Sequence, residues 1–92
     1  MSNARAHVYI QGRVQGVFFR ATAREKAVEL GIHGWVKNCL DGRVEAVFEG
    51  KNDAIDKMIN WCRRGPVGAV VDDVQIHTEK FSGKFDEFSI IY

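Results

Sequence analysis

Residues 6–30 read AHVYIQGRVQGVFFRATAREKAVEL, and the hydrophobic period of this stretch changes once along its length. From Ala6 to Val14, small or apolar residues alternate with larger polar or aromatic ones, which predicts a strand with one buried face. From Phe19 to Leu30, apolar residues recur at helical spacing, which predicts a helix with one buried face. Gly16 lies between the two segments, where glycine permits the turn from strand into helix.

The next stretch predicts a hairpin of two strands. Gly31 is a natural end for the first helix. Residues 32–38 and 43–49 each alternate between apolar and polar positions, so we expect two strands. Asp41-Gly42 between them suits the two-residue turn whose twist matches that of the flanking strands.

The last part of the chain predicts a second helix and two further strands. We expect Asn52 or Asp53 to cap the helix and Gly65-Pro66 to end it. The apolar stripe of this helix comprises Ile55, Met58, Ile59 and Cys62. Residues 70–78 are expected to form a fourth strand, and residues 85–92 a short fifth one.

This order of elements predicts one α+β domain over residues 1–92, with a ferredoxin-like split βαβ plan. We expect a mixed sheet of four to five strands that carries two helices on one face. In this plan the first two strands run parallel and the third lies between them, so their backbones are about 10 Å apart. The turn after Val14 and the strand end at Asn38 should therefore face each other at one edge of the sheet.

Composition limits the classes of function that are compatible with the chain. Its 92 residues fit one domain, and a net charge of +1 argues against a large binding surface for nucleic acid or anionic membranes. Cys39 and Cys62 form no CxxC pair or zinc pattern, so we expect two reduced thiols, although a disulfide stays open. Residues 1–6 do not resemble a signal peptide and no run approaches the roughly 18 apolar residues of a membrane span, so we expect a cytoplasmic protein.

The segment GRVQGVFFR, residues 12–20, carries the clearest chemical signal. It joins a strand to a helix N-terminus, where free backbone N–H groups and the helix dipole favour an anion. Arg20 adds a planar cation that can contact two phosphate oxygens. The segment is neither a Walker A loop nor a dinucleotide fingerprint. On these grounds alone, an ordinary turn with a surface arginine remains open.

The same segment closely resembles the signature of the acylphosphatase family. The resemblance continues through Gly34-Trp35-Val36-Lys37-Asn38 and Asp41-Gly42-Arg43-Val44-Glu45, and it covers nearly the whole chain. Gly50, Gly65-Pro66 and residues 88–92 fit as well. Cys39 occupies a position that varies in the family.

The resemblance implies an enzyme that hydrolyses acyl phosphates to a carboxylate and inorganic phosphate, without metal or cofactor. It implies that Arg20 binds the phosphate and that Asn38 orients the water. The implied phosphate cradle consists of the backbone amides of Gln15, Gly16, Val17, Phe18, Phe19 and Arg20. The partners would be a small acyl phosphate and inorganic phosphate, as product or competitive inhibitor. We expect a monomer that binds neither nucleic acid nor membrane.

The remaining conspicuous residues have ordinary interpretations. We expect Phe18 and Phe19 to pack in the loop and the core and to shape the apolar side of a pocket. Trp35 lies on the opposite strand face from Val36 and receives no catalytic role. The residues expected at the surface are His7, His33, His77, Asp72 and Asp73. A meeting of two or three of the histidines across the sheet stays open, although no spacing demands a metal. Asp72 and Asp73 are adjacent on a strand and point to opposite faces, so they do not simply share a proton or an ion.

Three other functions compete with the hydrolase. An RNA-binding module could use Tyr9 and Trp35 on the open sheet face, but the third strand offers Glu45 and Glu49 instead of a basic aromatic motif. A carbamoyl-phosphate-handling domain of larger hydrogenase-maturation proteins would share the phosphate loop. An inactive binding module of the same fold is the third, and the presence of both Arg20 and Asn38 weighs against it.

Overall fold

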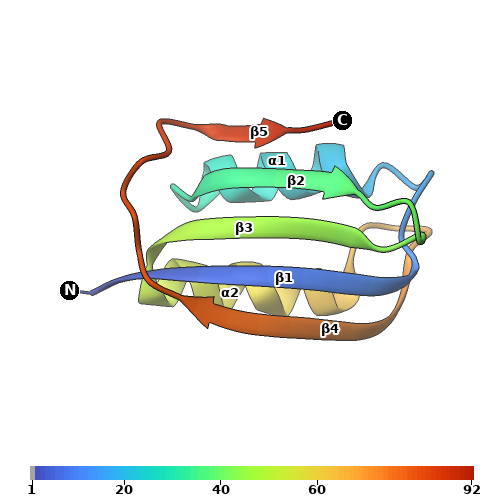
Figure 1. The fold of residues 1–92 in the computed structure, drawn as a ribbon. Helices are drawn as coiled ribbons and strands as arrows, with labels where there is room; N and C mark the ends of the chain where they lie inside the picture. The colour runs from blue at the N-terminus through green and yellow to red at the C-terminus, as the bar shows by residue number, and fades with distance from the viewer. Residues whose placement is uncertain (1) are drawn as a thin grey trace.

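The elements follow the predicted order in the computed structural model, which describes residues 2–92 (Figure 1). They are β1 (Asn3–Arg13), α1 (Phe19–Glu29), β2 (His33–Asn38), β3 (Val44–Lys51), α2 (Asn52–Arg64), β4 (Val70–Glu79) and β5 (Phe88–Ile90). The fifth strand is shorter than the predicted range 85–92, because only Phe88, Ser89 and Ile90 pair with β2.

The sheet has five strands in the order β4-β1-β3-β2-β5. Strand β3 is antiparallel to both β1 and β2, so these two run in the same direction, and β5 is parallel to β2. Both helices lie on one face of the sheet, behind it in Figure 1. The predicted split βαβ plan is therefore confirmed, and β1 and β2 end at the same edge.

The core lies between the sheet and the two helices, and the predicted apolar faces supply it. Ala6, Val8 and Ile10 of β1 are buried, as are Phe19, Ala23 and Ala27 of α1. Aromatic contacts extend the core: Phe19 of α1 packs on Trp61 of α2 with ring centroids 5.2 Å apart, and Phe48 of β3 stacks on Phe88 of β5 at 5.7 Å. The hydrophobic period therefore predicted which face of each element is buried.

The predicted cap of the second helix is wrong. The N-cap of α2 is Lys51, in extended conformation, and it makes no side-chain capping hydrogen bond. Strand β3 runs directly into α2, and the backbone N–H of Asn52 donates to the carbonyl of Ser2 at 3.1 Å. The start of the chain thus satisfies a donor that a capping side chain would otherwise take.

The β2–β3 hairpin is present, but its turn differs from the predicted two-residue type. The N–H of Cys39 donates to the carbonyl of Arg43 at 2.8 Å, which leaves a three-residue loop from Leu40 to Gly42. Among residues 2–92, Phe18 is the one non-glycine residue with positive φ, so Asp41 lacks the φ that the predicted turn needs. Gly42 alone supplies it, with φ 96°.

Candidate active site

The loop between β1 and α1 has an unusual backbone. Gly16 has φ 73° and Phe18 has φ 60° and ψ 26°, so both are left-handed, whereas Val17 between them is not. Changes of backbone hand along a loop direct successive N–H groups to one side and form a concave site for an anion. The predicted role of Gly16 in curling this loop is confirmed.

A cavity of about 280 Å³ lies at the edge where β1 and β2 end. It is lined by Val14, Gly16, Phe18, Phe19, Arg20, Ala21, Asn38, Ile90 and Tyr92. Arg20 and Asn38 therefore meet in one cavity, as the topology predicted. Gln15 and Val17 do not line it, and the phosphate-binding roles of the loop residues stay predictions.

Arg20 presents a free positive charge to this cavity. Its Cζ atom lies 5.1 Å from the centre of the Tyr92 ring, in cation–π geometry. Among residues 2–92, no carboxylate lies within salt-bridge distance of the Arg20 guanidinium. The ring orients the guanidinium without neutralising it, so the charge is available to an anion.

Asn38 presents a free acceptor to the same cavity. It is the last residue of β2, where it pairs with Val44 of β3. Its Oδ1 atom is buried and has no hydrogen-bond partner among residues 2–92. Buried polar atoms are nearly always satisfied, so an unsatisfied oxygen at the edge of a cavity points to a ligand or water as its partner.

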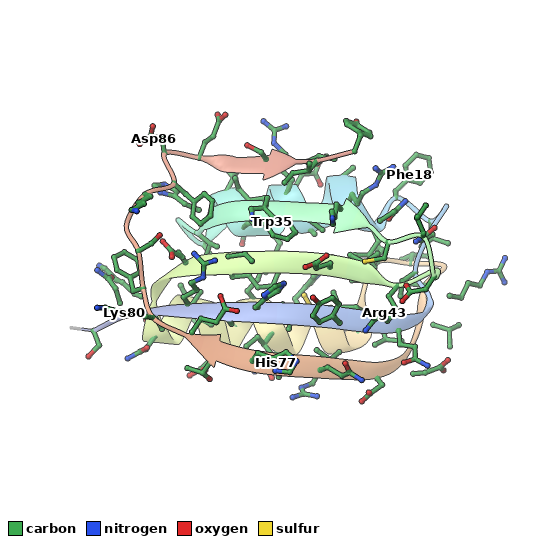
Figure 2. The ribbon with its side chains drawn as sticks, in the orientation of Figure 1. Phe18, Trp35, Arg43, His77, Lys80 and Asp86 are labelled. Atoms are coloured by element: carbon green, nitrogen blue, oxygen red, sulfur yellow. The ribbon has the colours of Figure 1, made fainter. Side chains whose placement is uncertain are left out.

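The two adjacent phenylalanines occupy different environments. Phe19 packs in the core, as predicted, and only 1% of its surface is exposed. Phe18 belongs to the loop and is 84% exposed, so it makes no part of the expected packing in the core. It occupies the left-handed position of the loop and lies at the end of the molecule next to the end of β2 (Figure 2). Phe18 does line the cavity, which agrees with the prediction that it shapes the apolar side of a pocket.

The thiol next to Asn38 is not poised for nucleophilic attack. Burial raises the pKa of Cys39, and the negative charge of Glu45 raises it further. The Cys39 thiol therefore stays protonated at neutral pH, whereas a nucleophilic cysteine needs the thiolate. Both cysteines are free, as predicted, and burial raises the pKa of Cys62 strongly.

A polar network that sequence reasoning missed covers the open face of the sheet. His7 contacts two carboxylates, with Nε2 2.6 Å from Glu45 and Nδ1 3.0 Å from Glu79, and its ring stacks on Tyr9. The prediction of a surface position for His7 is therefore only partly right, because the residue is half-buried. Cross-strand neighbours of β1, which are not adjacent in sequence, supply both carboxylates.

The aromatic rings on this face are already in contact with cations of the same chain. Arg43 lies over Tyr9 at 4.5 Å and Lys37 over Trp35 at 6.0 Å. Figure 2 shows Trp35 and Arg43 on the sheet face turned away from the helices. These contacts leave less ring surface for base stacking, which weighs against the RNA-binding alternative.

The other predicted surface residues are where they were expected. His33, His77, Asp72 and Asp73 are exposed. Within residues 2–92, no group of three or more His, Cys, Asp or Glu side chains is arranged to hold a metal ion. The same part of the chain contains no helix that is both long and apolar enough to span a membrane.

Glu49 is a second residue whose role the sequence did not indicate. Its carboxylate is buried at the opposite end of β3 and accepts hydrogen bonds from Arg5, from the N–H and the hydroxyl of Ser82, and from the N–H of Gly83. Burial opposes its ionisation, but the bonds from Ser82 and Arg5 outweigh burial and lower its pKa. Glu49 thereby anchors the connection between β4 and β5 to the sheet.

Comparisons with known proteins agree with this geometry. A family model described as Acylphosphatase matches residues 6–90. An acylphosphatase of Roseiflexus sp. (strain RS-1) is 56% identical over 92 residues, which cover 100% of this chain and 99% of that protein. The structure of an acylphosphatase from Coxiella burnetii superposes with a TM-score of 0.92 at 38% identity, covering 97% of this chain and 93% of that one.

A much longer chain contains the same fold. The crystal structure of T. kodakarensis HypF matches with a TM-score of 0.84 at 29% identity. The match covers 97% of this chain but only 12% of the HypF chain. The fold and the predicted resemblance are thus confirmed by relatives that match over nearly their whole length.

Proposed function

The chain belongs to the acylphosphatase family, and from this premise we propose that it hydrolyses acyl phosphates to a carboxylate and inorganic phosphate. One observation carries the proposal. A cation without a carboxylate partner among residues 2–92, Arg20, and an acceptor without a hydrogen-bond partner there, Asn38 Oδ1, line the same cavity. An anion and a water molecule are the ligands that these two groups would satisfy.

The first step is capture of the phosphoryl group. Its oxygens bind the curled loop that follows β1, where the backbone amides of residues 15–20 and the N-terminus of α1 favour negative charge. The Arg20 guanidinium contacts the same oxygens and neutralises the charge that develops on them during the reaction. Inorganic phosphate would occupy the same place and act as a competitive inhibitor.

The second step is attack by water. Asn38 Oδ1 accepts a hydrogen bond from the water and holds it in line with the bond that breaks. The water oxygen forms a bond to phosphorus while the bond between phosphorus and the acyl oxygen breaks, and that electron pair leaves with the carboxylate. The water gives its proton to a phosphate oxygen, so atoms and charges balance.

This chemistry requires little beyond positioning. The leaving group is a carboxylate, a weak base whose conjugate acid has a pKa of about 4, so it departs from phosphorus without a general acid. An acyl phosphate is already activated, so no covalent intermediate is needed, and the protonated thiol of Cys39 plays no part in bond formation. We therefore propose a reaction that is independent of metal and cofactor. As a separate proposal, the protein acts as a monomer.

The test is hydrolysis of benzoyl phosphate by the wild type in the presence of a chelator, with inorganic phosphate as inhibitor. We expect turnover that the chelator does not reduce and that phosphate inhibits competitively. If the folded wild type showed no turnover, the inactive binding module of the same fold would replace the hydrolase as the favoured function. Loss of turnover on exhaustive chelation, restored by one metal, would contradict the metal-free mechanism.

A further inference from the structure

The side chain of Gln15 joins two parts of the active site that the sheet connects only indirectly, through β3. Its Nε2 atom donates to the carbonyl of Cys39 at 2.8 Å and to the carbonyl of Arg43 at 2.9 Å. Gln15 belongs to the loop after β1, whereas the two carbonyls belong to the β2–β3 hairpin. One amide group therefore spans from the phosphate loop to the hairpin that follows Asn38.

Both carbonyls are already part of the base of the hairpin. The Arg43 carbonyl accepts from the N–H of Cys39 at 2.8 Å, and the Cys39 carbonyl accepts from the N–H of Gly42 at 3.2 Å. Gln15 thus adds a second donor to each of them and contacts the residue directly after Asn38. A displacement of the hairpin relative to the loop would break both of its hydrogen bonds.

No ladder of the sheet can replace this connection. Strand β3 lies between β1 and β2, so the loop that bears Arg20 and the strand end that bears Asn38 share no backbone pairing. The distance between this loop and the end of β2 depends on the width of β3 and on contacts at the edge of the sheet where β1 and β2 end. The half-buried Gln15 amide is such a contact, and it lies outside the cavity that Arg20 and Asn38 line.

We propose that Gln15 is a positioning residue for the reaction, whose side chain fixes Asn38 at its distance from Arg20 and the phosphate cradle. This inference rests on the proposed function. Misplacement of a reacting group by on the order of 1 Å can cost about 10²-fold in rate. Phosphate binding uses groups on the loop alone, so loss of the Gln15 contacts should lower turnover and spare phosphate affinity.

Gln15→Met tests this inference, because methionine has a similar length and no donor. We expect kcat for benzoyl phosphate to fall roughly 10- to 100-fold, while the inhibition constant of inorganic phosphate stays within about threefold, a change too small to indicate a lost charged contact. Gln75→Met, at an exposed position of β4, is the matched control and should leave both constants unchanged. An unchanged kcat in Gln15→Met, or phosphate binding weakened as much as kcat, would overturn the inference.

A double-mutant cycle distinguishes positioning from a general loss of structure. If Gln15 acts through Asn38, Gln15→Met should have no further effect on kcat in the Asn38→Ala background. An equal loss in both backgrounds would assign Gln15 a role that does not pass through Asn38. A wild type without turnover would overturn the proposed function and this inference together, whereas an active wild type with an unaffected Gln15→Met overturns the inference alone.

Gln15→Glu provides a second variant that keeps size and polarity. At neutral pH its carboxylate would face two carbonyl oxygens and repel them. The two facing carbonyl oxygens would raise the pKa of this carboxyl group above the ordinary glutamate value of about 4.3, and once protonated the group can again donate one hydrogen bond. The ratio of its kcat to that of the wild type should therefore rise as the pH falls, and a ratio that does not change with pH would count against the inference.

Discussion

The two ends of β3 lie beside polar groups in opposite states. Near its first residue, Asn38 Oδ1 is buried without a hydrogen-bond partner among residues 2–92, and Arg20 lies there without a carboxylate. Near its last residues, the buried carboxylate of Glu49 accepts four hydrogen bonds. In Figure 2, Phe18 marks the first end and Lys80 and Asp86 mark the second.

The difference separates binding from stability. A satisfied polar group contributes to folding, and its removal leaves its partners unpaired. An unsatisfied group makes folding less favourable and is useful only when a ligand supplies the missing partner. Substitutions at the two ends should therefore affect different properties: activity at the Arg20 end and stability at the Glu49 end.

The largest expected effect is that of Arg20→Gln. The phosphoryl group loses a charge-assisted partner, which costs about 2–5 kcal/mol, or roughly 30- to 5,000-fold in kcat/KM. Steady-state hydrolysis of benzoyl phosphate measures this loss, and thermal unfolding should show a folded protein. Arg63→Gln, at an exposed position of α2, is the control. Near-normal turnover in Arg20→Gln would remove the arginine from the mechanism.

Asn38→Ala should reduce kcat by roughly 10²-fold or more, because the water loses its acceptor. Inorganic phosphate should still bind, which isothermal calorimetry can measure. Since Oδ1 has no partner within residues 2–92, the free energy of unfolding should not fall as it would for a satisfied group. Asn60→Ala, at an exposed site on α2, provides the control. If phosphate binding disappeared instead, Asn38 would be a binding residue.

Glu49→Gln should have the opposite pattern. The amide replaces one acceptor oxygen by a donor that faces other donors, so we expect a loss of about 1–3 kcal/mol in unfolding free energy. In a domain of this size that corresponds to a decrease in Tm of about 4–8 °C per kcal/mol. The kcat of the folded variant should equal that of the wild type. Glu25→Gln, exposed on α1, should change neither property, and a large loss of kcat in Glu49→Gln would break the separation between the two ends.

Acid should weaken the Glu49 end by a smaller amount. The folded-state pKa of Glu49 lies below the ordinary value of 4.5, because hydrogen bonds from Ser82 and Arg5 outweigh the effect of burial. Its contribution is therefore fully present above about pH 4.5 and is lost as the pH falls through the lower, folded-state pKa. Urea unfolding between neutral and acid pH should show the loss. The Glu49→Gln variant should lose less stability over this range than the wild type, and equal slopes would contradict the assignment.

The sequence predicted local structure more fully than contacts between distant segments. The alternation from Ala6 to Val14 and the glycine stops at Gly31 and Gly65 follow from backbone geometry and burial, which neighbouring residues encode. The topology then predicted that Arg20 and Asn38 share one edge, and the family resemblance selected them from many polar residues.

Other features were beyond the reach of sequence patterns for physical reasons. Hydrophobicity favours burial of Phe18, but the left-handed backbone of the loop places its side chain outside the core. The partner of Glu49, Ser82, lies 33 residues further along the chain, in a loop whose path no local pattern describes. The bridge from Gln15 to the hairpin is hidden for the same reason.

The insertion of β3 between β1 and β2 also has a consequence for the order of events during folding. The β2–β3 hairpin is local and can form within microseconds, whereas β1 must pair with β3 across the intervening α1 and β2, which is slower. The hairpin alone carries Asn38, but it has no phosphate cradle beside it until β1 docks. Recovery of turnover during refolding should therefore follow the docking of β1 on β3 and not the formation of the hairpin, so that catalysis itself reports a long-range pairing of the sheet.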